Sequence, residues 1–363
     1  METVPEGIKG TLTAKYGKII ESGTAVLDQL KELSVLSVSP AIDLALGGGF
    51  REGQVVVLTG DPKTGKTTTA LYAAAKAQAA GKKVYYVSTE GRLTKHNFTG
   101  IKGLDVDAIE IIQTTDDKPN ISAETYLNVM ERLIKEEENL FLICDSTSNM
   151  VPQDELDGEI RTGVRNALPR LLAMFFKRIS GDMQRMKAIG VFITHNITDT
   201  SGSRYGPARK SDCGTMLQFQ AGTNMIITHR GKWEVPKESG NHVGQIANWK
   251  VMTSAAGGTP LNQFQSWIRY GIGIDEAQEL AHTATEFALI QAKGAWYTLS
   301  SLVDDREEKT VSDWLKKNHP DAVKEEDIVK VFKFQGMEKV TNFLNENDEL
   351  REHIYGQIRE MFE

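Results

Sequence analysis

The sequence of 363 residues contains only two cysteines, Cys144 and Cys213. Cys144 lies in an apolar segment that predicts a strand, whereas Cys213 lies in a polar segment that predicts a loop. We therefore expect no disulfide between them. Such sparse cysteine usage favours a reducing compartment such as the cytoplasm.

Long hydrophobic runs are also missing. The apolar segments are only as long as β-strands, whereas a membrane-spanning helix needs roughly 20 apolar residues. Residues 1–6 have neither the basic region nor the apolar region of a secretory signal. We expect a protein of the cytoplasm (the host cytoplasm if the source is viral) with no membrane partner.

The sequence also lacks an excess of positive charge. The chain has 49 acidic and 42 basic side chains, which gives a formal net charge of -7. This charge argues against general coating of nucleic acid, so any DNA binding requires basic residues that are concentrated locally. With 40% hydrophobic residues, a chain of this length can bury a large core.

The most informative motif is a phosphate-binding loop (P-loop). The residues are Gly60, Asp61, Pro62, Lys63, Thr64, Gly65, Lys66 and Thr67, followed by Thr68, and they fit the pattern G-x-x-x-x-G-K-[ST]. Residues 54–59 predict a buried strand before the loop, and residues 68–80 predict a helix after it. Backbone N–H groups of such a loop hold phosphates, while Lys66 neutralises charge and Thr67 can bind Mg²⁺. The motif predicts a site for ATP and Mg²⁺.

The middle of the chain alternates between predicted strands and helices. Strands are expected at 82–88, 140–144 and 188–194, and helices at 125–134 and 169–186. Short apolar strands without alternation are typical of a parallel sheet that helices cover on both faces. Residues 224–228 and 248–252 are expected to extend this sheet. The fold class is therefore α/β.

Three regions are expected along the chain. Residues 10–33 have helical spacing with a break at 21–23, and residues 35–39 predict a lone strand. After residue 275 the pattern becomes helical, and residues 345–363 contain six acidic side chains. We expect an N-terminal element at 1–39, a core at 40–274, and a small C-terminal domain with an acidic end at 275–363.

Three polar residues end predicted strands on the edge where phosphates bind. Asp145 can hold Mg²⁺ through a bound water molecule. Glu90 can orient and deprotonate an attacking water, and His195 can contact the γ-phosphate. The alternatives are a solvated loop glutamate at Glu90 and a histidine with only local hydrogen bonds at His195.

We expect the contact between Asp145 and Mg²⁺ to run through a bound water molecule, whereas the hydroxyl of Thr67 binds the ion directly. The metal site predicted from the sequence therefore consists of Thr67 and Asp145.

Two polar segments follow these strand ends and are candidates for DNA binding. Residues 196–212 contain almost no apolar side chain, and so long a structureless segment in a compact domain is usually functional or disordered. Cations with an aromatic ring between them suit single-stranded nucleic acid. The candidate residues are Arg204, Tyr205, Arg209 and Lys210 in this segment, and Arg161, Arg165 and Arg170 after Asp145. The alternative for each segment is a solvated charged loop.

The order of these motifs resembles that of the RecA family, the ATP-dependent strand-exchange recombinases of bacteria and their UvsX-type phage relatives. The resemblance runs from about residue 10 to residue 335. The stretches that carry it are 43–49, 60–68, 144–146, 155–160, 270–274, 294–297 and 313–318. It implies a RecA-like P-loop ATPase core, with a mainly parallel sheet, an N-terminal oligomerisation element and a small C-terminal domain.

The resemblance also implies roles for individual residues. Glu90 is similar to the catalytic glutamate, and Phe98 occupies the place of an aromatic ring that stacks on adenine. His195 occupies the position of the γ-phosphate sensor. Residues 157–170 and 196–213 match the two DNA-binding loops.

Subunit contacts are implied in the same way. Phe219 matches an interface residue, and the strand near Val35 matches an element that docks on the next protomer. Where the bacterial family has two lysines that reach the neighbour's nucleotide, only Lys250 is present. The implied partners are single-stranded and double-stranded DNA, further copies of this chain in a helical filament, a single-strand-binding protein and a loader.

Two other functions share part of this pattern. A hexameric replicative helicase has the same core, but the N-terminal piece is too short for a separate helicase collar. A recombination mediator would bind nucleotide and barely hydrolyse it. The function expected from the sequence is an ATP-dependent recombinase that pairs homologous DNA and exchanges strands in recombination and repair.

Overall fold

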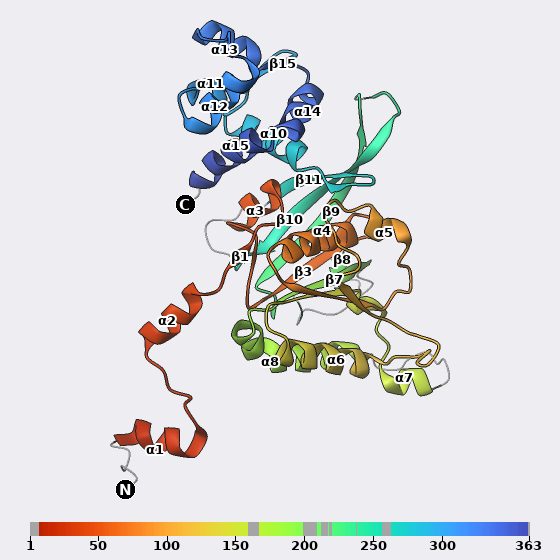
Figure 1. The fold of residues 1–363 in the computed structure, drawn as a ribbon. Coiled ribbons are helices and arrows are strands. Elements are labelled where there is room, and N and C mark those ends of the chain that lie inside the picture. Colours follow the sequence, from red (N-terminus) through yellow and green to blue (C-terminus); the bar gives the residue numbers. More distant parts are fainter. Residues whose placement is uncertain are drawn as a thin grey trace, which may run out of the picture. The chain divides into compact units, whose positions relative to one another are not determined.

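Parallel strand pairing organises the centre of the chain in the computed structural model, which describes residues 7–158, 167–198, 209–211, 217, 220–236, 238–255 and 263–361. The main sheet has the order β12-β11-β10-β9-β3-β7-β6-β4-β5 (Figure 1). Pairing is parallel from β9 to β5 and antiparallel from β9 to β12. The strands are β3 (Gln54–Gly60), β4 (Lys83–Ser88), β5 (Ile109–Ile112), β6 (Leu140–Asp145), β7 (Ile189–Thr198), β9 (Thr223–Glu234), β10 (His242–Thr253), β11 (Gln263–Arg269) and β12 (Gly273–Ile274).

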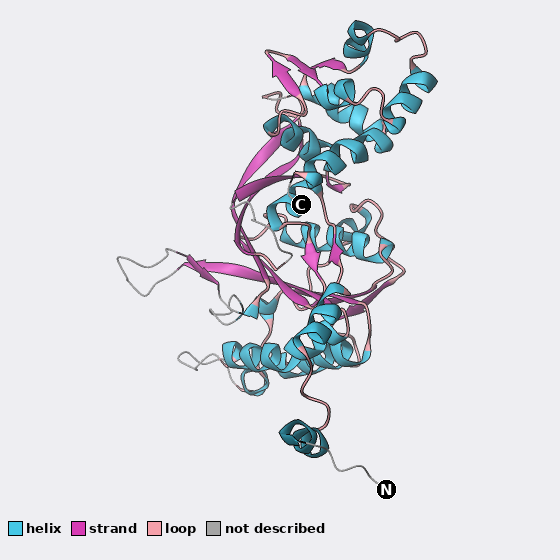
Figure 2. Cartoon of the chain, turned by 90° about the vertical axis from the view of Figure 1, so that its left-hand side faces the viewer, coloured by secondary structure: helices cyan, strands magenta, loops and turns pink. Residues whose placement is uncertain are grey.

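Helices cover both faces of this sheet, as Figure 2 shows from a second direction. The helices on one face are α3 (Pro40–Leu46), α4 (Lys66–Ala79) and α5 (Lys95–Thr99), and those on the other face are α6 (Ala123–Glu136) and α8 (Leu168–Arg185). A 3-10 turn (Thr147–Asn149) and α7 (Gln153–Asp157) lie between β6 and α8. The predicted α/β class is confirmed, with a mixed, mostly parallel sheet.

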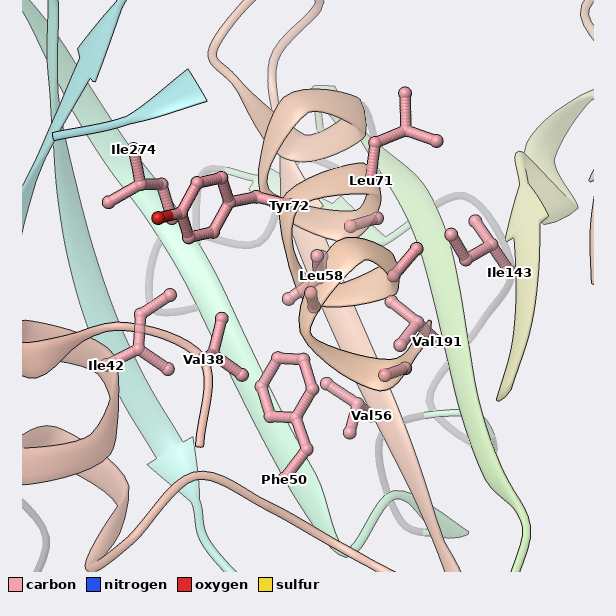
Figure 3. Close-up of a cluster of buried hydrophobic side chains, with 14 of the residues drawn as sticks. Val38, Ile42, Phe50, Val56, Leu58, Leu71, Tyr72, Ile143, Val191 and Ile274 are labelled. Carbon is pink, nitrogen blue, oxygen red and sulfur yellow. The ribbon is translucent and has the colours of Figure 1, made fainter. Parts of the chain in front are cut away.

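The two faces of the sheet are apolar because successive side chains of a strand point in opposite directions. In β3, Val56 and Leu58 pack beneath α4, whereas Val55 and Val57 pack against α6 and α8. Figure 3 shows Leu58 and Leu71 among the side chains of the first of these two cores. Burial on both faces explains why these strands are continuous apolar runs in the sequence.

The strand predicted at residues 35–39 is shorter than expected and is not alone. β1 (Val35–Leu36) pairs antiparallel with β2 (Phe50–Arg51). Leu36 is buried in the core under α4, while Val35 is 37% exposed. The pairing partner lies within the same chain, after the turn at Gly47–Gly49, which the apolar pattern of 35–39 did not reveal.

The polar segment at 196–212 was expected to be structureless, and at its two ends this expectation is wrong. β7 continues to Thr198, and residues 196–198 pair antiparallel with β8 (Arg209–Ser211). Backbone pairing does not require apolar side chains, so the composition of the segment concealed the ribbon. Residues 199–208 lie outside the described part of the chain.

Residues 7–34 belong to a separate unit, Met1–Ser34. It contains α1 (Gly7–Tyr16) and α2 (Gly23–Lys31), so the interruption in the helical pattern spans residues 17–22. The side chain of Ser22 caps α2 by accepting a hydrogen bond of 3.1 Å from the backbone N–H of Ala25. The second unit comprises Val35–Glu363.

A third hydrophobic core lies among the helices that follow β12. Their bounds are α10 (Glu276–Glu286), α11 (Ser300–Asp304), α12 (Lys309–Asn318), α13 (Glu325–Val331), α14 (Met337–Glu346) and α15 (Asp348–Glu360), and β13 (Gln291–Lys293), β14 (Trp296–Thr298) and β15 (Lys333–Gln335) form a small antiparallel sheet. None of the helices in the described ranges is long and apolar enough to cross a membrane. The domain boundaries at 39/40 and 274/275 stay predictions.

Polar side chains join this helical part to the core under α4. Tyr355 of α15 donates a hydrogen bond of 2.6 Å to Asp43 Oδ2 of α3. Burial raises the pKa of Asp43 to about 6. Nearby, Glu279 of α10 is fully buried and accepts a hydrogen bond of 3.1 Å from the backbone N–H of Ala41, and burial raises its pKa to about 8.

The variant Glu279→Gln should remove the loss of folding stability that the wild type shows as pH rises. Between about pH 4.5 and 8 the unfolded chain ionises Glu279 whereas the folded protein keeps it protonated, so the stability of the wild type falls as pH rises. The free energy of unfolding of the variant relative to wild type should rise by on the order of 1 kcal/mol per pH unit in this window. Urea unfolding at several pH values measures it. Glu286→Gln, an exposed position on the same helix, is the control, and identical pH dependence of all three proteins would contradict the assignment.

Candidate active site

The P-loop lies between the end of β3 and the first turn of α4. Lys63 and Gly65 both have left-handed backbone conformations, with φ of 61° and 107°. A Cβ atom at Gly65 would lie 2.3 Å from Ile268 Cδ1, so this position accepts only glycine without a shift of its neighbours. The Lys66 ammonium donates hydrogen bonds of 2.8 Å to the carbonyls of Gly60 and Asp61. The loop therefore curls around its own lysine at the start of a helix.

Asp145 and Thr67 are brought together as the sequence predicts. The Thr67 hydroxyl donates a hydrogen bond of 2.6 Å to Asp145 Oδ2, and Tyr86 donates another of 2.6 Å to the same oxygen. Asp145 is buried, and this burial raises its pKa. A hydroxyl beside a carboxylate at a P-loop fits Mg²⁺, which binds through one or two protein oxygens and several waters. No cluster of three or more His, Cys, Asp or Glu occurs within the described ranges, and Mg²⁺ does not require one.

Glu90 and His195 also meet, although 105 residues separate them in the sequence. His195 Nε2 lies 2.6 Å from Glu90 Oε1, and the Ser146 hydroxyl donates a hydrogen bond of 2.9 Å to the same oxygen. The bond to His195 is the main reason why the pKa of Glu90 is lowered. His195 Nδ1 is buried and has no hydrogen-bond partner in the described part of the chain. The candidate base is thus held ionised by the candidate sensor.

Residues 62–68 of the P-loop and Glu90, Asp145 and His195 line one cavity of about 780 Å³, which is large enough for a nucleotide. The P-loop forms one wall, and the strand ends at Glu90, Asp145 and His195 form another. A third wall comes from the antiparallel strands β9 to β11 and the turn that follows β11, and it was not predicted from the sequence. Its residues are Arg230, Gln245, Ile268, Arg269, Tyr270 and Gly271.

Phe98 does not occupy the position expected for an adenine-stacking ring. It is 9% exposed, does not line the cavity, and packs edge-on against Tyr86 with ring centroids 6.1 Å apart. The short helix α5 directs Phe98 into the core, while His96 from the same helix lines the cavity. Two tyrosines line the cavity, the buried Tyr86 and Tyr270, which is 63% exposed and therefore open to a ligand. The stretch at 270–274 was singled out in the sequence, but not as part of this site.

The predicted DNA-binding and interface residues stay predictions. Arg161, Arg165, Arg204, Tyr205 and Phe219 lie outside the described residues, and for Arg209 and Lys210 only the backbone of β8 is described. Arg170 lies in the first turn of α8 with its side chain exposed. Lys250 is exposed on β10, opposite Gln263 of β11.

Comparison with known proteins agrees with this arrangement of motifs. The family model described as the RecA N-terminal domain matches residues 11–275, most of the chain. The chain belongs to the RecA family. This finding confirms the family resemblance and supports a RecA-type recombinase.

Similarity to individual RecA proteins extends beyond that domain. Protein RecA of Limosilactobacillus reuteri is 30% identical over 310 residues, which cover 85% of this chain and 82% of the relative. Protein RecA of Thermotoga neapolitana is 28% identical over 325 residues, with coverage of 89% and 82%. Protein RecA of Halalkalibacterium halodurans is 26% identical over 347 residues, with coverage of 95% and 87%. The similarity to RecA thus includes much of the helical C-terminal part.

The bond between His195 and Glu90 gives a testable prediction for this RecA-family chain without nucleotide. In His195→Ala the pKa of Glu90 should rise, because the main contact that stabilises its ionised form is lost. Carboxyl carbon-13 NMR of glutamate-labelled protein measures the titration. His96→Ala removes another histidine from the same cavity and should leave it unchanged. An unaltered Glu90 titration in His195→Ala would count against the contact.

Proposed function

We propose that this chain is an ATP-dependent homologous recombinase that forms filaments on single-stranded DNA and exchanges strands during recombination and repair. One observation carries the proposal. A single cavity combines a P-loop lysine, a carboxylate beside a P-loop hydroxyl, and a glutamate after β4 bonded to a histidine of β7. These are the groups that phosphate binding and attack by water require.

ATP would bind with its phosphates against the P-loop and the first turn of α4, where N–H groups and the helix dipole favour anions. Lys66, now bonded to two carbonyls of the loop, would turn its ammonium towards the β- and γ-phosphates. Thr67 and Asp145 would hold Mg²⁺, the latter through water. When bound, the ion supplies charge neutralisation between the phosphates. The adenine ring of ATP would lie near Tyr270.

Glu90 would act as the general base for the attacking water. In the structure its carboxylate is occupied by His195, which lowers its basicity. A γ-phosphate that accepts a hydrogen bond from His195 would draw the ring away from Glu90. The pKa of Glu90 would then rise, and its carboxylate would be available to take a proton from water. His195 would thus couple the binding of ATP to the pKa of Glu90, and hence to its ability to take a proton from water.

The same histidine would connect ATP to DNA. It lies in β7, directly before residues 196–198, which pair with β8 at the base of the segment proposed to bind DNA. A movement of His195 towards a phosphate would shift the end of β7 and with it this paired ribbon. Such a coupling is typical of switches that γ-phosphate orders and hydrolysis releases.

The proposal also includes binding partners and contacts between protomers. We propose double-stranded DNA, a single-strand-binding protein and a loader as further partners, and the cytoplasm as the location. Val35, Phe219 and Lys250 remain proposed contacts between protomers, with Lys250 reaching a neighbour's nucleotide.

The variant Lys66→Ala tests the reaction. Loss of one cation from the transferring phosphate should reduce ATP turnover at least a hundredfold, since a single donor to a developing charge contributes on this scale. ATP-dependent strand exchange should disappear with it. The assays are phosphate release with single-stranded DNA and strand transfer between homologous substrates, with thermal unfolding as the control for folding. Full strand exchange by the variant would refute the mechanism.

Imaging separates the proposed filament from the two alternative functions. Negative-stain micrographs with single-stranded DNA and a non-hydrolysable ATP analogue should show helical filaments. Rings together with unwinding of a forked duplex would indicate a helicase. Filaments whose ATP turnover stays at background with and without DNA would indicate a mediator.

A further inference from the structure

Arg230 lies beside the P-loop because of the register of β9. In the parallel pairing of β3 with β9, Gly60 lies opposite Ile227, and β3 ends there. β9 continues to Glu234, so Arg230 is three residues, or about 10 Å, beyond that point. This places it on the side of the P-loop opposite to β7 and His195.

The side chain of Arg230 contacts the loop directly. Its Nη1 donates a hydrogen bond of 2.9 Å to the carbonyl oxygen of Lys63, and the side chain lines the cavity. Lys63 is the non-glycine residue of the loop with a positive φ, a conformation that costs free energy unless neighbouring contacts hold it. Gln245 of the adjacent strand β10 approaches the loop as well, since its Nε2 would lie 3.0 Å from a Cβ at Gly65.

Arg230 differs from the other arginines of the cavity in its electrostatic partners. Arg269 forms an ion pair of 2.7 Å with Asp275 and lies over the ring of Trp233. Arg92 lies 3.9 Å from Glu90. Among the described residues, no carboxylate lies within ion-pair distance of Arg230, and its one hydrogen bond to Lys63 uses one of five guanidinium N–H groups. The exposed side chain of Arg230 thus lines the cavity, and its positive charge has no counter-ion among the described residues.

From these contacts we infer that Arg230 binds the phosphates of the nucleotide from within the same chain and positions the P-loop to receive them. One N–H group donates to the Lys63 carbonyl and fixes the backbone of the P-loop there. The other N–H groups donate to phosphate oxygens. A rigid guanidinium fork suits both tasks, since a phosphate accepts parallel N–H donors. The inference rests on the proposed ATP site, and it adds a cation that does not depend on a neighbouring subunit.

The test is calorimetric titration of MgATP into the full chain and its variants. Arg230→Gln should weaken binding about tenfold, the loss of one charge-assisted contact. Arg230→Lys, which keeps the charge, should recover part of the affinity. Lys232→Gln removes the same charge two residues further along β9, at an exposed position that does not line the cavity, and should bind like wild type.

Steady-state ATP hydrolysis gives a second readout. In Arg230→Gln the KM for ATP should rise while kcat changes little, because Glu90 and His195 remain in place. A Kd within twofold of wild type in both Arg230 variants would overturn the inference. The proposed function fails separately, if wild type binds no MgATP or if Lys66→Ala binds it equally well.

Discussion

Parallel pairing of β3 with β7, and of β6 with β4, is the constraint on which the rest of the site depends. Parallel strands end at one edge of a sheet, so residues far apart in the sequence come together there. Asp145 ends β6, Glu90 follows β4, and His195 lies in β7 opposite Gly60, where β3 ends and the P-loop begins. The apolar faces of these strands, packed under α4 and against α6 and α8, hold the edge in place.

The two carboxylates at this edge are in contrasting electrostatic environments. Burial raises the pKa of Asp145, while the contact with His195 lowers that of Glu90. A buried carboxylate with two hydroxyl donors is suited to share a cation, whereas a carboxylate that loses its histidine partner becomes more basic. The surroundings of the two carboxylates thus differ in the way that the proposed metal-binding role of Asp145 and the proposed proton-accepting role of Glu90 require.

Local sequence predicted the parts of the fold that follow from short-range rules. The P-loop, the apolar strands and the residues at their ends were accessible because strand period and loop chemistry are local properties. Arg230 and Tyr270 were not, since Arg230 reaches the cavity through the register of β9 on β3, and Tyr270 lies in the turn between β11 and β12. Phe98 faces the core although the resemblance places it against adenine. The sequence does not reveal which side of α5 faces the core. The ribbon of β7 and β8 was missed because its residues are polar.

The bond between Tyr355 and Asp43 joins residues 312 positions apart. During synthesis at about 5–20 residues per second, Asp43 therefore waits on the order of 15–60 s for its hydroxyl partner. Until then, the partners described for the carboxylate are Ser37 and the backbone of Val38 and Ser39, which lie close to it in the sequence. The segment that begins the ATPase core can reach its final packing only after the last helix has been made, so the order of synthesis and the order of folding differ in this protein.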